Sequence, residues 1–79
     1  MEMTVESKKL FKEFALDAGN WSGIPLVNGN VEVNRKTRGN LSDLVKKGLV
    51  KVVTDSGCEW VVFTNEGKKL ALEWFQVSI

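Results

Sequence analysis

The chain has 79 residues, which is the length of one small domain, and its hydrophobic and charged fractions are those of a soluble globular protein rather than a disordered segment. No apolar run reaches the roughly 20 residues that span a bilayer, and the N-terminus is acidic and polar, unlike a secretory signal. A single cysteine, Cys58, excludes an intrachain disulfide and suits a reducing cytosol. We therefore expect one cytoplasmic domain over residues 1–79, without a membrane segment.

The residue types that most active sites and metal sites use are scarce. The chain has no histidine, so Cys58 cannot form a Cys–His pair or a Cys/His zinc cluster. Its seven glycines form neither a phosphate-binding loop nor a dinucleotide fingerprint. Catalysis by carboxylates alone remains open in principle. We expect a protein that is not an enzyme and that uses no cofactor or metal.

Residues 4–18 have the pattern of an amphipathic helix, with Thr4 as its N-cap and Gly19 as a left-handed stop. The next segment, residues 19–33, contains Gly and Pro that break any helical period. Within it, Asn28-Gly29 lies between two apolar runs, which is a strong signal for a β-hairpin turn. We expect a short β-hairpin or loop here, with Trp21 at one end of the core.

Helical periodicity returns over residues 34–47, with Asn34 as the cap and Gly48 as the terminator. Residues 49–63 hold two strand-like runs around Asp-Ser-Gly, which predicts a β-hairpin. Thr64 then caps a third helix over residues 65–75. The side chains expected to be buried together are Phe11, Phe14, Leu41, Leu44, Val45, Leu49 and Trp60.

Positive charge is concentrated in residues 34–51, which hold six basic residues and one acid, a net +5 in a chain of net +1. Such segregation is typical of a surface that binds a polyanion, although charged helix faces are more often simply solvated. At 100° per residue, the positions opposite the apolar stripe are Arg35, Lys36, Gly39, Asp43, Lys46 and Lys47. Gly39 either permits close approach to a groove or packs under a neighbouring element. Arg38 lies near the edge of the stripe, where it can brace the hairpin instead of contacting a ligand.

Two local sequences resemble parts of a winged helix-turn-helix domain. "LSDLVKKGLVKV" is similar to the end of a recognition helix and the first wing strand, and "WVVFTNEGKKLA" to the second wing strand and the following helix of regulators of the multiple-antibiotic-resistance type. The resemblance covers residues 34–72 and includes the T-x-x-G-x-x-L pattern at Thr64, Gly67 and Leu70. It implies an α+β fold, a small winged-helix-like domain with three helices and a hairpin wing in its C-terminal half.

The segment 19–33 departs from that family, because standard members have a second helix where this chain has a predicted hairpin or loop. Small variants of this kind also resemble accessory proteins of phages and mobile elements, by size and architecture only. The expected function is a small protein that binds duplex DNA, as a transcriptional regulator or nucleic-acid accessory factor. The candidate DNA-binding residues are Arg35, Lys36, Arg38, Asn40, Ser42, Lys46 and Lys47.

The chemistry of these residues divides their expected roles. Arg35 and Arg38 can donate paired hydrogen bonds to guanine or phosphate, whereas the lysines are suited to phosphate alone. The predicted wing tip at Ser56-Gly57 carries no cation and is flanked by Asp55 and Glu59, so we expect it to be held away from DNA.

The rival interpretation is a phage-type module whose basic face engages an acidic partner protein and inhibits or redirects it. It is supported by apolar residues near the C-terminus that exceed what one helix face must bury, namely Trp74, Phe75, Val77 and Ile79. The same residues could form a homodimer contact. The sequence alone leaves these alternatives open.

Overall fold

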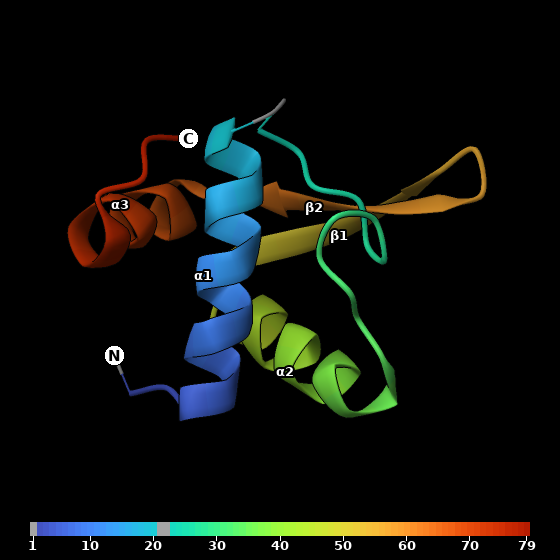
Figure 1. The fold of residues 1–79 in the computed structure, drawn as a ribbon, viewed down its shortest axis with the longest axis horizontal. Helices are drawn as coiled ribbons and strands as arrows, with labels where there is room; N and C mark the ends of the chain where they lie inside the picture. The colour runs from blue at the N-terminus through green and yellow to red at the C-terminus, as the bar shows by residue number, and fades with distance from the viewer. Residues whose placement is uncertain (1, 21–22) are drawn as a thin grey trace.

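The computed structural model describes residues 2–20 and 23–79, so the role predicted for Trp21 lies outside the described residues. The fold is α+β, a small winged-helix-like domain with three helices and an antiparallel hairpin in the C-terminal half, which confirms the predicted class (Figure 1). Its elements are α1 (Val5–Asn20), α2 (Arg35–Lys46), β1 (Val50–Asp55), β2 (Cys58–Phe63) and α3 (Asn65–Phe75).

All three helices begin at the predicted caps. The Thr4 hydroxyl accepts a hydrogen bond from the amide of Ser7 at 3.1 Å, and the Thr64 hydroxyl accepts one from the amide of Gly67 at 3.1 Å. At α2, the Asn34 side chain accepts from the amide of Thr37, whose hydroxyl accepts from the amide of Asn34 at 2.8 Å. These reciprocal bonds form a capping box, which satisfies amides that have no partner within the helix.

The stop predicted for α1 at Gly19 is wrong, because the helix continues to Asn20 and Gly19 lies inside it. A Cβ atom at Gly19 would lie only 2.7 Å from Cγ1 of Val77. Glycine is therefore needed here for space rather than for a left-handed backbone: it lets the C-terminal tail approach α1 closely.

The segment that replaces a second helix is a loop, one of the two forms expected for it. The hairpin turn predicted at Asn28-Gly29 is wrong: Asn28 has a positive φ of 61°, but the amide of Gly29 donates to the carbonyl of Leu26 at 3.1 Å, which centres the turn on Val27-Asn28. The two arms meet in a parallel bridge between Val27 and Val31, so no antiparallel hairpin forms here. The N-terminal arm of the loop pairs with β2, through hydrogen bonds from the amide of Val27 to Glu59 O (2.9 Å) and from the amide of Val61 to Pro25 O (2.7 Å). Residues 25–27 thus lie along the free edge of β2 through a single antiparallel bridge, without forming a strand of the two-stranded sheet.

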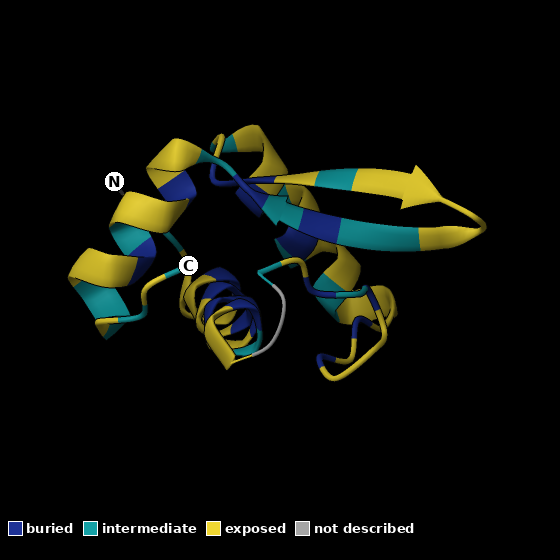
Figure 2. Cartoon of the chain, turned by 90° about the horizontal axis from the view of Figure 1, so that it is seen from above, coloured by how far each residue is buried: buried dark blue, intermediate teal, exposed yellow. Residues whose placement is uncertain are grey.

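The hairpin projects beyond the helices and turns at Ser56-Gly57 (Figures 1 and 2). Both turn residues have positive φ, 52° and 78°, as a two-residue turn that matches strand twist requires. The face toward the helices carries buried Val50, Val61 and Phe63. Because side chains alternate along a strand, the residues between them point to the opposite face.

The core surrounds Phe11, whose ring centroid lies 5.7 Å from that of Phe63 and 5.8 Å from that of Phe75. Among the described residues, Phe11, Phe14, Leu41, Leu44 and Leu49 are buried in it as predicted. Two predicted members do not belong to this group.

The burial predicted for Val45 and Trp60 is wrong. Val45 is 41% exposed, because it lies at the edge of α2 in a groove that the projecting hairpin leaves open toward Val52. Trp60 is half-buried. Because side chains alternate along β2 and buried Val61 points to the inner face, the side chain of Trp60 points to the outer face of the sheet.

We expect Leu44→Ala to lower the free energy of unfolding by about 2–5 kcal/mol, because Leu44 is fully buried and truncation leaves a cavity. The matched variant Val45→Ala, one residue along the same helix, should change it by about 0.5 kcal/mol or less. Urea unfolding of both variants measures the difference. Equal losses would mean that α2 is rotated relative to the structure.

We expect Gly67→Ala and Gly39→Ala to have effects of opposite sign. A Cβ atom on Gly67 would overlap the carbonyl group of Leu49, whereas a Cβ atom on Gly39 would meet no atom within 4 Å. Overpacking against backbone should cost Gly67→Ala about 1–3 kcal/mol, and Gly39→Ala should gain about 0.5–1 kcal/mol of helix propensity. Thermal unfolding of the two variants tests this, and a stabilised Gly67→Ala would contradict the contact.

Candidate nucleic-acid interface

The surface of α2 that faces away from the core has one exposed row along the helix. Arg35, Gly39, Ser42 and Lys46 are all exposed, and they recur at the three- and four-residue spacing that aligns side chains on a helix. Buried Leu41 and Leu44 occupy the other side. We call this row, together with exposed Lys36 beside Arg35, the α2 outer face. It contains four of the seven predicted DNA-binding residues.

Arg38 lies on the edge of α2 nearest to the hairpin, where its Nη2 atom is 2.8 Å from Oε1 of Glu59 on β2. The bracing role considered for Arg38 is therefore present in the structure. An exposed pair of this kind contributes about 0–1 kcal/mol, so its main effect is positional. It joins α2 to the hairpin and offsets one of the two acids beside the hairpin tip.

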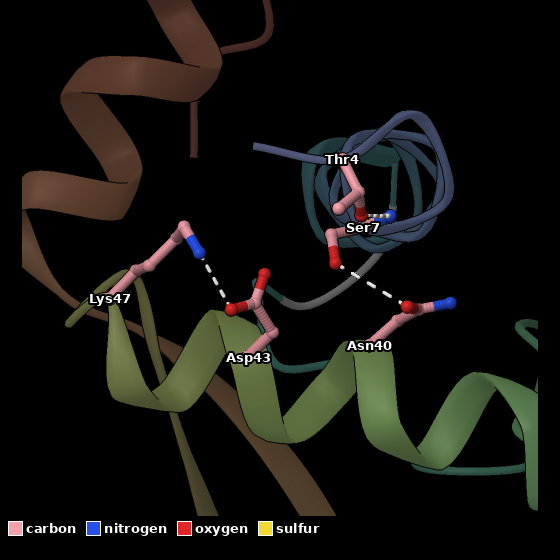
Figure 3. Close-up of polar contacts among 5 residues, drawn as sticks. All are labelled: Thr4, Ser7, Asn40, Asp43 and Lys47. Atoms are coloured by element: carbon pink, nitrogen blue, oxygen red, sulfur yellow. Dashed lines mark hydrogen bonds and ion pairs between the residues drawn. The ribbon is translucent and has the colours of Figure 1, made fainter. Parts of the chain in front are cut away.

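The opposite edge of α2 contacts α1 through a polar cluster, shown in Figure 3. The hydroxyl of Ser7, a residue only 1% exposed, donates to Oδ1 of Asn40 at 3.4 Å. Nζ of Lys47 lies 2.6 Å from Oδ1 of Asp43. Asn40 and Lys47, both predicted to contact DNA, are thus half-buried and hold internal partners.

The ammonium group of Lys47, followed by the hydroxyl of Ser7, lowers the pKa of Asp43 below its ordinary value. A hydrogen bond or a positive charge beside a carboxylate favours its ionised form. Asp43 therefore stays negative at neutral pH and offsets the charge of Lys47. Neither residue adds net charge to the α2 outer face.

Lys36 is exposed and lies beside a groove between α1 and the start of α2, lined also by Glu6, Glu13 and Glu32. Within residues 2–20 and 23–79, Arg35, Lys36 and Lys46 make no salt bridge. These three cations are the charge that α2 presents to a ligand. Lys51, the remaining cation of the basic segment, lies on β1 instead.

Gly39 lies in the middle of the α2 outer face. Because a Cβ atom there would have no neighbour within 4 Å, the alternative that Gly39 packs under another element is wrong. The centre of the face is consequently flat, with cationic side chains on either side along the helix.

The sequence did not indicate the apolar groove beside this face. It lies between α2 and the inner face of the hairpin, with Leu41, Val45 and Val52 in its lining and Ser42 and Lys46 along its rim. The available signal was the position of Val45 at the edge of the apolar stripe of α2.

Comparisons with protein-family models, with curated proteins and with solved structures found no match. In the described part of the chain, no helix is long and apolar enough to cross a membrane, and no three His, Cys, Asp or Glu side chains are grouped to hold a metal ion.

We expect the stability difference between the wild type and Asp43→Asn to depend on pH. Since the pKa of Asp43 is lowered in the folded state, its contribution is fully present above its unfolded pKa of about 3.9 and is lost as pH falls through the folded value. Urea unfolding between about pH 7 and pH 2 measures this. Glu73→Gln, which removes a negative charge from the surface of α3, is the control, and a pH-independent difference would contradict the pairing.

Proposed function

We propose that this protein binds duplex DNA through the α2 outer face, as a small transcriptional regulator or nucleic-acid accessory factor. The observation that carries the proposal is the set of three cations around the open position of Gly39, namely Arg35, Lys36 and Lys46, which make no salt bridge within the described part of the chain. The side chains of Arg38 and Lys47, the other two cations of α2, pair with acids of the same chain. The positive charge available to a ligand is therefore concentrated around Gly39.

The side chains of this face match the two kinds of contact that DNA offers. Lys36 and Lys46 suit phosphates, which position a protein without reporting base sequence. Arg35 can donate two parallel hydrogen bonds to the edge of guanine, and Ser42 one to a base or phosphate. Sequence preference should therefore come mainly from Arg35.

The dimensions of α2 also suit a duplex. Twelve residues give a helix of about 18 Å, and the major groove, about 12 Å wide, admits a single helix. The absence of a side chain at Gly39 lets the helix axis approach the base edges. Val45 and Val52, in the adjacent groove, offer an apolar surface of the kind that contacts a thymine methyl group.

The hairpin tip has the wrong charge for a phosphate contact. Asp55 lies beside the Ser56-Gly57 turn, and Glu59 is offset by Arg38. We therefore assign binding to α2 and give the hairpin the role of bracing it.

One observation offered for the protein-binding alternative, the apolar residues near the C-terminus, gives it less support than the sequence suggested. Trp74, Phe75, Val77 and Ile79 are half-buried against the core, so they are not a free apolar surplus. The ring of Trp74 is further covered by Lys8, whose Nζ lies 4.7 Å from its centroid. Duplex DNA is the ligand that the remaining exposed groups support best.

We expect titration with mixed-sequence duplex DNA to give a log–log salt slope of about −3, because three unpaired cations each release about 0.9 counterion. Lys46→Ala should shallow that slope by about one unit and weaken all sequences alike. Lys69→Ala, which removes the same charge from α3, should leave the slope unchanged. Fluorescence anisotropy over a range of salt measures all three proteins.

Two further variants test contact by α2 itself. Arg35→Ala should cost about 1–3 kcal/mol on a preferred site and little elsewhere. Gly39→Leu should weaken binding without loss of fold stability, because the site is open in the free protein. Failure of the wild type to bind duplex DNA at about 50 mM salt would overturn the proposal.

A further inference from the structure

The outer face of the sheet has a row of large apolar side chains at its centre. Val53 on β1 pairs with Trp60 on β2, and Trp60 makes an isolated antiparallel bridge on its other side with Leu26 in the loop. Residues paired directly across antiparallel strands place their side chains on the same face. Leu26, Trp60 and Val53 thus form one row across the loop edge, β2 and β1.

This row is not covered by the core. Val53 is 46% exposed and nearby Ile24 is 45% exposed, and both line a shallow hollow with Trp60 and Val62. A sheet with one face on the core and the other in water normally alternates apolar and polar residues. In this sheet the centre of the outer face is apolar as well, and an exposed apolar patch of this kind is typical of an interaction surface.

Two opposite charges flank the row symmetrically. Lys51 and Asp55 lie two residues before and two after Val53, on the same face of the same strand. At about 3.3 Å per residue they are about 13 Å apart, too far to pair with each other. In the part of the chain that the structure describes, neither Lys51 nor Asp55 forms a salt bridge.

We propose that the outer face of the sheet is a homodimer interface, with a second copy of this chain packed face to face against it. A two-fold axis along the Leu26–Trp60–Val53 row sets β1 antiparallel to β1 of the other copy. That rotation places Lys51 opposite Asp55 of the partner subunit, and Asp55 opposite Lys51 of the partner subunit. The interface is isologous, with an apolar centre and two charge pairs at its rim.

Charge complementarity favours this occupant over others. A uniformly acidic partner would leave Asp55 opposed by like charge, and a basic partner would do the same to Lys51. Pairing of β1 edge to edge would leave Leu26 and Trp60 uncovered. A face-to-face copy covers the apolar row and also places an opposite charge against both Lys51 and Asp55.

The α2 outer face lies on the other side of the sheet. Arg38 of α2 pairs with Glu59, which shares the inner face with buried Val61 and Phe63. Dimerisation therefore leaves the DNA-binding cations exposed, and the two proposals are independent.

Sedimentation equilibrium of the full chain without nucleic acid tests the proposal. We expect reversible association of the wild type, and at least about tenfold weaker association for Val53→Lys, which puts a charge at the centre of the interface. Leu72→Lys, at a position 56% exposed on α3, should associate like the wild type. A wild type that stays monomeric at about 500 μM, a concentration that would reveal millimolar association, overturns the proposal.

Charge reversal tests the orientation of the two copies. Lys51→Glu and Asp55→Lys each create two like-charge contacts across the axis, so each variant alone should associate at least about tenfold more weakly than the wild type. An equimolar mixture of the two should form a heterodimer, because every pair across its interface is again opposite in sign. The double variant should also regain association. Single variants that associate like the wild type, or a mixture that stays monomeric, would overturn the face-to-face arrangement.

Discussion

The close contact between Gly67 and the backbone of Leu49 is the constraint on which the arrangement of the other elements depends. At this point the end of α2, the start of β1, the end of β2 and the start of α3 meet. The amide of Thr64 donates to Leu49 O at 3.1 Å, and its hydroxyl donates to Gly48 O at 2.6 Å. The hairpin thus leaves the helices in a fixed direction, which sets both the groove beside α2 and the exposed outer face of the sheet.

The six cations of residues 34–51 have three different structural roles. Arg38 and Lys47 pair with acids on opposite edges of α2, one toward the hairpin and one toward α1. Arg35, Lys36 and Lys46 remain on the exposed surface of the helix, and Lys51 belongs to the sheet. The net charge of a basic segment in a sequence is therefore an upper limit on the charge that a ligand can contact, because some of its cations form ion pairs within the chain.

Local signals predicted most of the fold. The caps at Thr4, Asn34 and Thr64 depend on a few neighbouring residues, and all three were found where expected. The errors at Val45 and Trp60 concern burial, which depends on where a distant element stops covering a surface. For the same reason, the sequence could nominate seven binding residues but could not separate Asn40 and Lys47, which are engaged with α1 or within α2, from those that face solvent.

The positions of the two proposed surfaces follow from the alternation of side chains along β2. Glu59 and Val61 point to the inner face, where α2 and the core lie, and Trp60 points away from them. An isolated two-stranded hairpin is only marginally stable, so one covered face is needed to hold it. Because the inner face of the hairpin packs on the core and so stabilises it, folding does not require apolar residues on the outer face. Their presence at Val53 and Trp60 is best explained by contact with another molecule, separate from the cations of α2.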